Sequence, residues 1–143
     1  MTYEELLTEY DTEDLIIKEK SLPGYQGRIY KNRIAIHKSL STAEKACVLA
    51  EELGHHYTTV GDILDQNDTG NRKQEQRARL WAYNKLIGLM GIVNAYNHHC
   101  QSLSESAEYL DVTEEFLKDA LIHYKNKYGR CASVDNYVIF FEP

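Results

Sequence analysis

The chain has 143 residues, of which 43% are hydrophobic and 27% charged, and these values suit one globular domain built around one core. A formal net charge of −6 argues against broad non-specific attraction to nucleic acid or to an anionic membrane, and no apolar run is long enough to cross a bilayer. The acidic N-terminus does not resemble a secretion signal, and the three widely spaced cysteines form no disulfide framework, so we expect a cytoplasmic protein.

The first third of the chain predicts a short helix, a loop and a hairpin. Residues 2–12 carry apolar side chains at helical spacing, and residues 21–27 hold the proline and glycines of a loop. The stretch RIYKNRIAIH, residues 28–37, alternates in polarity on both sides of Lys31 and Asn32. That pattern is typical of two antiparallel strands joined by a turn.

Helices dominate the rest of the predicted structure. Ser41 and Glu44 form a capping box that opens a helix over AEKACVLAEELGHHY. A loop is expected around Gly61 and residues 65–71, then one long helix from about residue 72 to residue 97. Residues 100–128 predict a short helix, a turn and a longer helix, and NYVIFF at the end is a β-type run. We therefore expect an α+β fold, with a small antiparallel sheet packed by helices in a single domain of residues 1–143.

The stretch LAEELGHHY, residues 49–57, contains candidate metal ligands and a candidate catalytic carboxylate. At about 100° per residue, Glu51 and His55 share one side of the helix, and Glu52 lies between that side and the core edge. The core stripe on the other side is formed by Ala46, Leu49, Ala50, Leu53 and Tyr57. Two ligands one turn apart can hold one metal ion, and a neighbouring carboxylate can reach the water on it.

Taken alone, this segment favours a solvent-exposed polar face over a metal site, because surface helices usually carry such a face opposite the core stripe. His56 lies nearer the core stripe and is expected to be a packed histidine rather than a ligand. Cys47, one turn before Glu51, is expected to be a buried thiol that takes no part in the site.

Glu75 provides a candidate third ligand. It lies within about 60° of the apolar stripe of the long helix, which predicts that its carboxylate faces the core. A buried carboxylate needs a positive partner, and a metal ion held by the preceding helix would supply one. The alternative is that Glu75 only benefits from the dipole of the helix N-terminus. His37, Asp62 and Asp68 are the fallback ligands.

Taken together, these features resemble the ImmA/IrrE family of metallopeptidases. The resemblance rests on the hairpin GRIYKNRIAIH, the helix TAEKACVLAEELGHHYTTVGD and the segment EQRARLWAYNKLI, in that order. It implies a zincin-like fold, Glu52 as the catalytic general base, and Glu51, His55 and Glu75 as ligands of zinc, or of manganese or another divalent metal. Glu51 departs from the family pattern, which has histidine in that position. The resemblance also implies that the substrate is a helix-turn-helix repressor of a phage or other mobile element.

Two other functions remain open on sequence alone. Loss of the first histidine is also compatible with an inactive module that binds a repressor without cutting it. Residues 100–128 resemble a helix-turn-helix, so a DNA-binding regulator is a further alternative. The second helix of that unit begins with Glu114 and Glu115, however, and phosphate contacts need lysine or arginine there. Direct binding to nucleic acid or to a membrane is therefore not expected.

Overall fold

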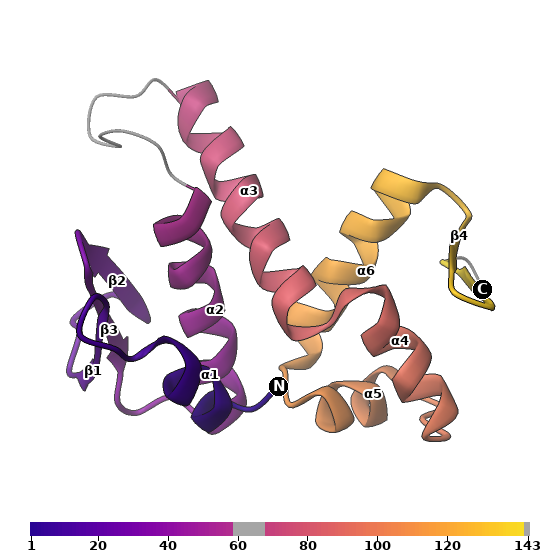
Figure 1. Cartoon of the computed structure of the whole chain (residues 1–143), viewed down its shortest axis with the longest axis horizontal. Helices are drawn as coiled ribbons and strands as arrows, with labels where there is room; N and C mark the ends of the chain where they lie inside the picture. Colours follow the sequence, from indigo (N-terminus) through magenta and orange to yellow (C-terminus); the bar gives the residue numbers. More distant parts are fainter. Residues whose placement is uncertain (59–67, 142–143) are drawn as a thin grey trace.

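The computed structural model of the chain describes residues 1–58 and 68–141 and shows an α+β fold (Figure 1). Within those residues, no helix is both long and apolar enough to cross a membrane. The elements follow one another as α1 (Tyr3–Tyr10), β1 (Ile16–Lys20), β2 (Gly27–Tyr30), β3 (Arg33–His37), α2 (Thr42–Thr58), α3 (Asp68–Leu86), α4 (Gly88–Asn97), α5 (Leu103–Leu110), α6 (Glu114–Tyr128), β4 (Cys131–Val134) and β5 (Tyr137–Phe140).

The sheet beside α2 is mixed rather than purely antiparallel. The predicted hairpin is confirmed, since β2 and β3 pair antiparallel around Lys31, which adopts a φ of 53° in the turn. Strand β1 adds a parallel pairing with β3, which gives the order β1-β3-β2. The predicted α+β fold with a small sheet packed by helices is confirmed, but β1 was not predicted, because IIKEK is short and highly charged and its partner cannot be read from local pattern. Strand β2 is left at one edge of the sheet.

Helix α2 lies between the three-stranded sheet and α3 (Figure 1). The predicted capping box opens it: the Ser41 backbone N–H donates to Glu44 Oε1 at 3.0 Å, and the Glu44 N–H donates to Ser41 Oγ at 3.2 Å. Four members of the predicted core stripe are fully buried, namely Ala46, Leu49, Ala50 and Leu53. Tyr57 is an exception at 51% exposure, because it lies at the last turn of α2, where the helix leaves the core.

The predicted long helix is two helices. Helix α3 begins at Asp68, earlier than expected, and ends at Leu86; α4 starts at Gly88. Ile87 leaves the helical region with φ −122° and ψ −75°, and Gly88 takes a positive φ of 65°. Glycine adopts that conformation at little cost, whereas the apolar pattern simply continues across the break. The predicted loop before residue 68 lies outside the described residues.

The C-terminal part has the predicted short helix, turn and longer helix. Helices α5 and α6 pack together and are joined at Asp111, which adopts the left-handed conformation that ends many helices. Thr113 caps α6 by accepting from the Phe116 N–H at 3.1 Å. The β-type run near the C-terminus is confirmed as β5, which pairs with β4 and contacts α4.

Candidate metal centre between α2 and α3

The close approach of α2 and α3 positions the site. A Cβ atom placed on Gly54 would lie 2.9 Å from both Cα and the carbonyl carbon of Ala78, so only glycine allows the two backbones to come this near. Both residues are fully or nearly fully buried. The next turns of the two helices therefore place His55 of α2 opposite Glu75 of α3.

His55 and Glu75 form the one direct contact among the predicted ligands. Nε2 of His55 lies 3.3 Å from Oε1 of Glu75, and their side chains are 16% and 52% exposed. The prediction that Glu75 faces the core was wrong. Gln74, at 7% exposure, takes that direction instead, because it lies a full turn before the buried Ala78. Glu75 reaches the site from the outer side of α3.

Glu52 lies between α2 and the edge strand β2. A Cβ atom on Gly27, the first residue of β2, would lie 3.3 Å from Cγ and 3.4 Å from Oε1 of Glu52. Burial raises the pKa of Glu52 to about 7, and the carboxylates of Glu51 and Glu75 add to the rise. A carboxyl group that titrates near neutrality can take up and return a proton at physiological pH. Gly27 was not predicted to contact the site, although a glycine that opens a predicted strand beside the motif helix was an available signal.

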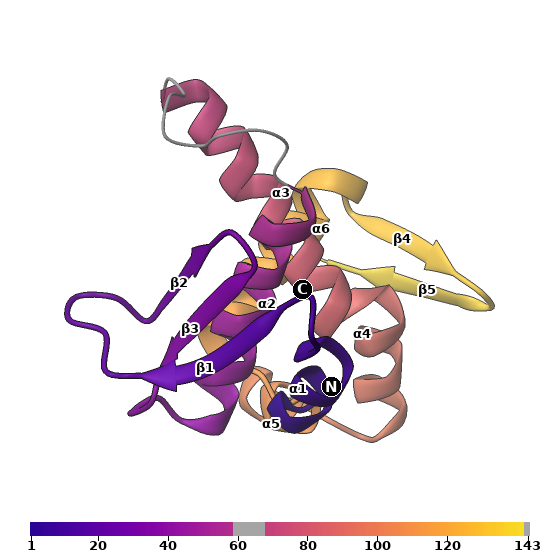
Figure 2. The same cartoon turned by 60° about the vertical axis from the view of Figure 1, so that its left-hand side comes forward.

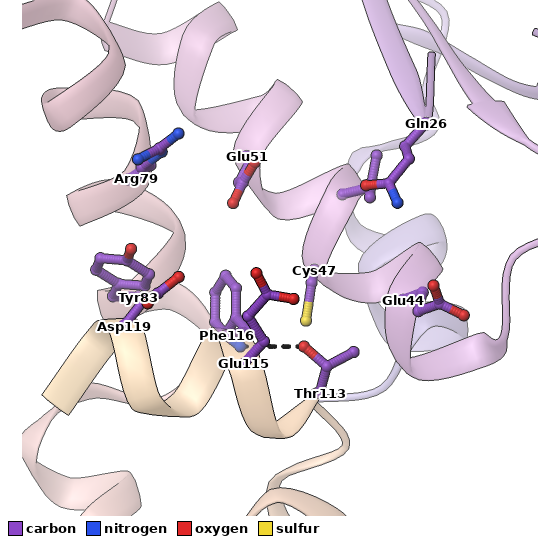
Figure 3. A pocket seen from close by; sticks show the side chains of 11 residues that line it. Gln26, Glu44, Cys47, Glu51, Arg79, Tyr83, Thr113, Glu115, Phe116 and Asp119 are labelled. Carbon is purple, nitrogen blue, oxygen red and sulfur yellow. Dashed lines mark hydrogen bonds between the residues drawn. The ribbon is translucent and has the colours of Figure 1, made fainter. Parts of the chain in front are cut away.

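Glu51 faces a separate pocket of about 320 Å³ between α2, α3 and α6. Figure 3 shows Arg79 of α3 and Tyr83 on one side of this pocket, with Glu115 and Asp119 of α6 below Glu51. Burial raises the pKa of Glu51; Arg79 opposes the rise, and the carboxylates of Glu75, Asp119 and Glu115 add to it. The position of Arg79 in the pocket of Glu51 was not predicted, because the contact between α3 and α6 that forms this pocket is not a local pattern.

The donor groups suit a divalent cation, but the side chains of Glu51, His55 and Glu75 do not meet at one position in the structure. Imidazole and carboxylate groups are acceptable zinc or manganese ligands, and a cation would relieve the repulsion among Glu51, Glu52 and Glu75. Among the side chains that the structure describes, no group of three or more His, Cys, Asp or Glu is close enough to hold an ion. Glu51 lies one turn before His55 on α2, which is the spacing at which two side chains of one helix can hold the same ion.

The remaining candidates are occupied elsewhere or lie outside the described side chains. The ring Nδ1 of His37 is 3.1 Å from the Ser39 N–H, which donates to it. His56 packs edge-on against the ring of Tyr57, with centroids 4.8 Å apart. Burial raises the pKa of the Cys47 thiol to about 11, which makes it a poor ligand at neutral pH. Asp62, like the side chain of Asp68, belongs to the part of the chain that is not described.

Three aromatic rings cover the outer end of the α2–α3 contact. Tyr57 stacks on Trp81 with ring centroids 5.6 Å apart, and Tyr10 of α1 approaches both rings at 5.7 and 5.9 Å. The rings join the C-terminal ends of α1 and α2 to α3. Tyr30 lies in β2 at 72% exposure and is not part of the core.

Comparison with known proteins gives one result that identifies a family. The family model described as the IrrE N-terminal-like domain, a peptidase family, matches residues 9–121, which include α2, α3 and most of α6. Neither the curated proteins nor the solved structures include a match.

Proposed function

Because the chain belongs to the peptidase family with the IrrE N-terminal-like domain, we propose that it is a metal-dependent endopeptidase. Glu51, His55 and Glu75 would hold a divalent cation, zinc or manganese, and Glu52 would act as the general base. The observation that carries the proposal is the contact between His55 and Glu75 at 3.3 Å, which joins two helices at the predicted position of the motif. The two residues are 20 positions apart in sequence, and no local pattern of either helix requires them to meet.

Each residue has a distinct role in this proposal. The cation, when bound, supplies a Lewis acid that polarises the peptide carbonyl and acidifies a water molecule. His55 would contribute an imidazole nitrogen to the cation, and Glu75, which faces it, would contribute a carboxylate oxygen. The Glu52 carboxylate accepts a proton as the carbonyl is attacked and returns it to the amine that leaves. Glu52 is half-buried beside Gly27, which would keep it close to a substrate segment paired with β2.

The edge strand provides the means of holding a substrate. Among the described residues, β2 pairs with β3 alone, and it also contacts α2. An extended peptide can add to such an edge through backbone hydrogen bonds, which positions a peptide bond without requiring a particular side chain. Gly27 lets the strand come close to α2, because a Cβ atom there would meet the side chains of Val48 and Glu52. The proposed substrate is a helix-turn-helix repressor of a mobile element, and it rests on the family resemblance alone.

A cleavage assay tests the proposal. The purified protein, loaded with zinc or manganese, is incubated with the helix-turn-helix repressor encoded nearest to its own gene, and the products are followed by mass spectrometry. Glu52→Gln should retain the metal and lose cleavage by at least about 100-fold, the usual contribution of a general base. The matched control is Glu13→Gln, a residue exposed in the α1–β1 connection. Equal cleavage by Glu52→Gln and the control would reject the assigned role.

The inactive binding module remains the second candidate, since Glu51 is directed into its own pocket rather than toward His55. In that case the repressor would bind with equal affinity to metal-loaded and metal-free protein. No product would form with either.

A further inference from the structure

The face of the three-stranded sheet that lies away from α2 carries positive charge. Side chains alternate along a strand, so Ile17, Ile34 and Ile36 are buried on the inner face, and their neighbours point outward. The outward positions include Lys18, Lys20, Arg28 and Arg33, all of them exposed. Figure 2, turned from Figure 1 so that this side comes forward, shows the three strands in front of α2. We call these four residues, with Lys31 in the β2–β3 turn, the basic face.

The register places these cations around a hollow. Lys18 of β1 and Arg28 of β2 both pair with Ala35 of β3, so a small side chain lies between two long cationic ones. In the next row, Arg33 lies between Ile16 and Tyr30. The resulting groove has a volume of about 680 Å³, and none of its lining residues is acidic. Because neighbouring strands are about 4.8 Å apart, the groove spans about 10 Å across the sheet.

None of the ion pairs that the structure describes neutralises a cation of the basic face. Of the three ion pairs found among the described residues, none involves Lys18, Lys20, Arg28, Lys31 or Arg33. The acidic residue of β1, Glu19, points to the other face, where it accepts from Lys45 at 2.7 Å and from the Tyr3 hydroxyl at 3.1 Å. Five of the chain's 16 lysines and arginines therefore gather on one face of a protein whose net charge is −6.

Two exposed tyrosines accompany these cations. Tyr30 is 72% exposed and Tyr25 is 54% exposed, although large aromatic side chains are usually covered. The Arg28 guanidinium lies 4.7 Å from the Tyr25 ring centroid, and the Lys31 ammonium lies 5.5 Å from that of Tyr30. Rings flanked by cations suit a ligand that offers both flat apolar surfaces and anionic groups. An acidic peptide would use the cations and leave the rings without a role.

We propose that the basic face binds single-stranded nucleic acid. The cations would contact phosphates, and Tyr30 would stack on an unpaired base, as in other proteins that combine a positive groove with aromatic platforms. The net charge of the whole chain predicted no such contact. Phosphate binding depends on charges within about a Debye length, however, and on this face they are all positive. The proposal does not depend on the metal centre, because the basic face is the side of the sheet that points away from α2.

Fluorescence anisotropy with a labelled oligothymidylate of about 12 nucleotides tests the proposal on the full chain. Four phosphate contacts predict a slope of about −3 for the logarithm of affinity against the logarithm of salt concentration, so affinity should fall about 50-fold between about 50 and 200 mM salt. No binding at the lower salt concentration would overturn the proposal. Equal affinity for a duplex of the same length would also overturn it, because paired bases cannot stack on Tyr30.

Matched variants distinguish binding at the basic face from a general effect of net charge on affinity. Lys18→Glu with Arg33→Glu should weaken binding by at least about tenfold, since two phosphate contacts are replaced by repulsion. Lys118→Glu with Lys127→Glu changes the net charge equally on α6 and should leave affinity within about threefold, because these residues lie on another element. Equal losses in the two double variants would overturn the proposal.

The role of the ring distinguishes nucleic acid from an acidic partner. Tyr30→Ala should lower affinity for the oligonucleotide by about fivefold or more, and Tyr30→Phe should retain it, because stacking needs only the ring. Both variants should bind poly-glutamate as weakly as the unaltered protein does. Poly-glutamate binding as tight as the oligonucleotide, with no effect of Tyr30→Ala on either ligand, would assign the face to acidic peptides instead.

Discussion

Replacing Glu52 by glutamine should stabilise the metal-free protein at alkaline pH. The pKa of Glu52 is raised from 4.5 to about 7 by burial and by the carboxylates of Glu51 and Glu75. A raised carboxyl pKa means that the folded chain holds a proton that the unfolded chain has already lost. The associated stability is present below about pH 4.5 and is lost as the pH rises through about 7.

The magnitude follows from the shift. Each unit of pKa corresponds to about 1.4 kcal/mol, so the ionised Glu52 side chain costs the folded state up to about 3 kcal/mol at pH 8. Glutamine keeps the shape and removes the charge. Glu52→Gln should therefore raise Tm by up to about 10 °C at pH 8 for a chain of this size, and by almost nothing near pH 4.5.

Circular dichroism during thermal unfolding, with excess chelator at both pH values, measures the effect. Glu13→Gln serves as the control, because this side chain is exposed and makes no contact with the cluster. A Tm gain of the same size at both pH values would attribute the effect to packing. If Glu52→Gln showed no gain over the control at pH 8, the clustering of carboxylates around Glu52 would be refuted.

Three further predictions concern the packing that holds the site. Gly54→Ala should destabilise the fold by about 1–3 kcal/mol in urea unfolding, because the added methyl group meets the Ala78 backbone; a change below 0.5 kcal/mol would show that the helices separate freely. Leu53→Ala should cost about 2–5 kcal/mol in the same assay, since the side chain is fully buried in α2, and a smaller loss would mean that the core collapses around it. Thr113→Ala removes the hydrogen bond that the Phe116 N–H donates to the Thr113 side chain. It should lower the free energy of unfolding by about 1 kcal/mol, seen as a lower urea midpoint, and an unchanged midpoint would mean that water replaces the cap.

Local sequence patterns predicted most of the helices and strands. The capping residues Ser41 and Glu44, the alternation around Lys31 and the periodicity of α2 are properties of a few neighbouring residues, and the structure confirms each. Strand β1 was not predicted, because its parallel pairing with β3 joins segments separated by β2. The break at Gly88 was also not predicted, since glycine is tolerated within an apolar helical pattern and only its φ of 65° reveals the end.

The candidate site was predictable in its residue types but not in its geometry. The spacing of Glu51, Glu52 and His55 on α2 placed three polar groups within one turn, and Glu75 does contact His55. The predicted direction of the Glu75 side chain was wrong, because an angular estimate cannot separate two adjacent helix positions. Gln74, and not Glu75, is the residue that is buried. The direction of the Glu51 side chain toward the pocket with Arg79 depends on how α6 packs, which the sequence of α2 does not contain.

The measurement that tests the central claim most directly is calorimetric titration of the metal-free protein with zinc. The account predicts one zinc ion per chain, with binding abolished by His55→Ala and retained by His56→Ala, whose ring packs against Tyr57 instead. Glu75→Ala should weaken binding by about 10-fold or more, because it removes the group that faces His55. Zinc binding of equal stoichiometry and affinity in His55→Ala and His56→Ala would contradict the claim that α2 and α3 share a metal ion.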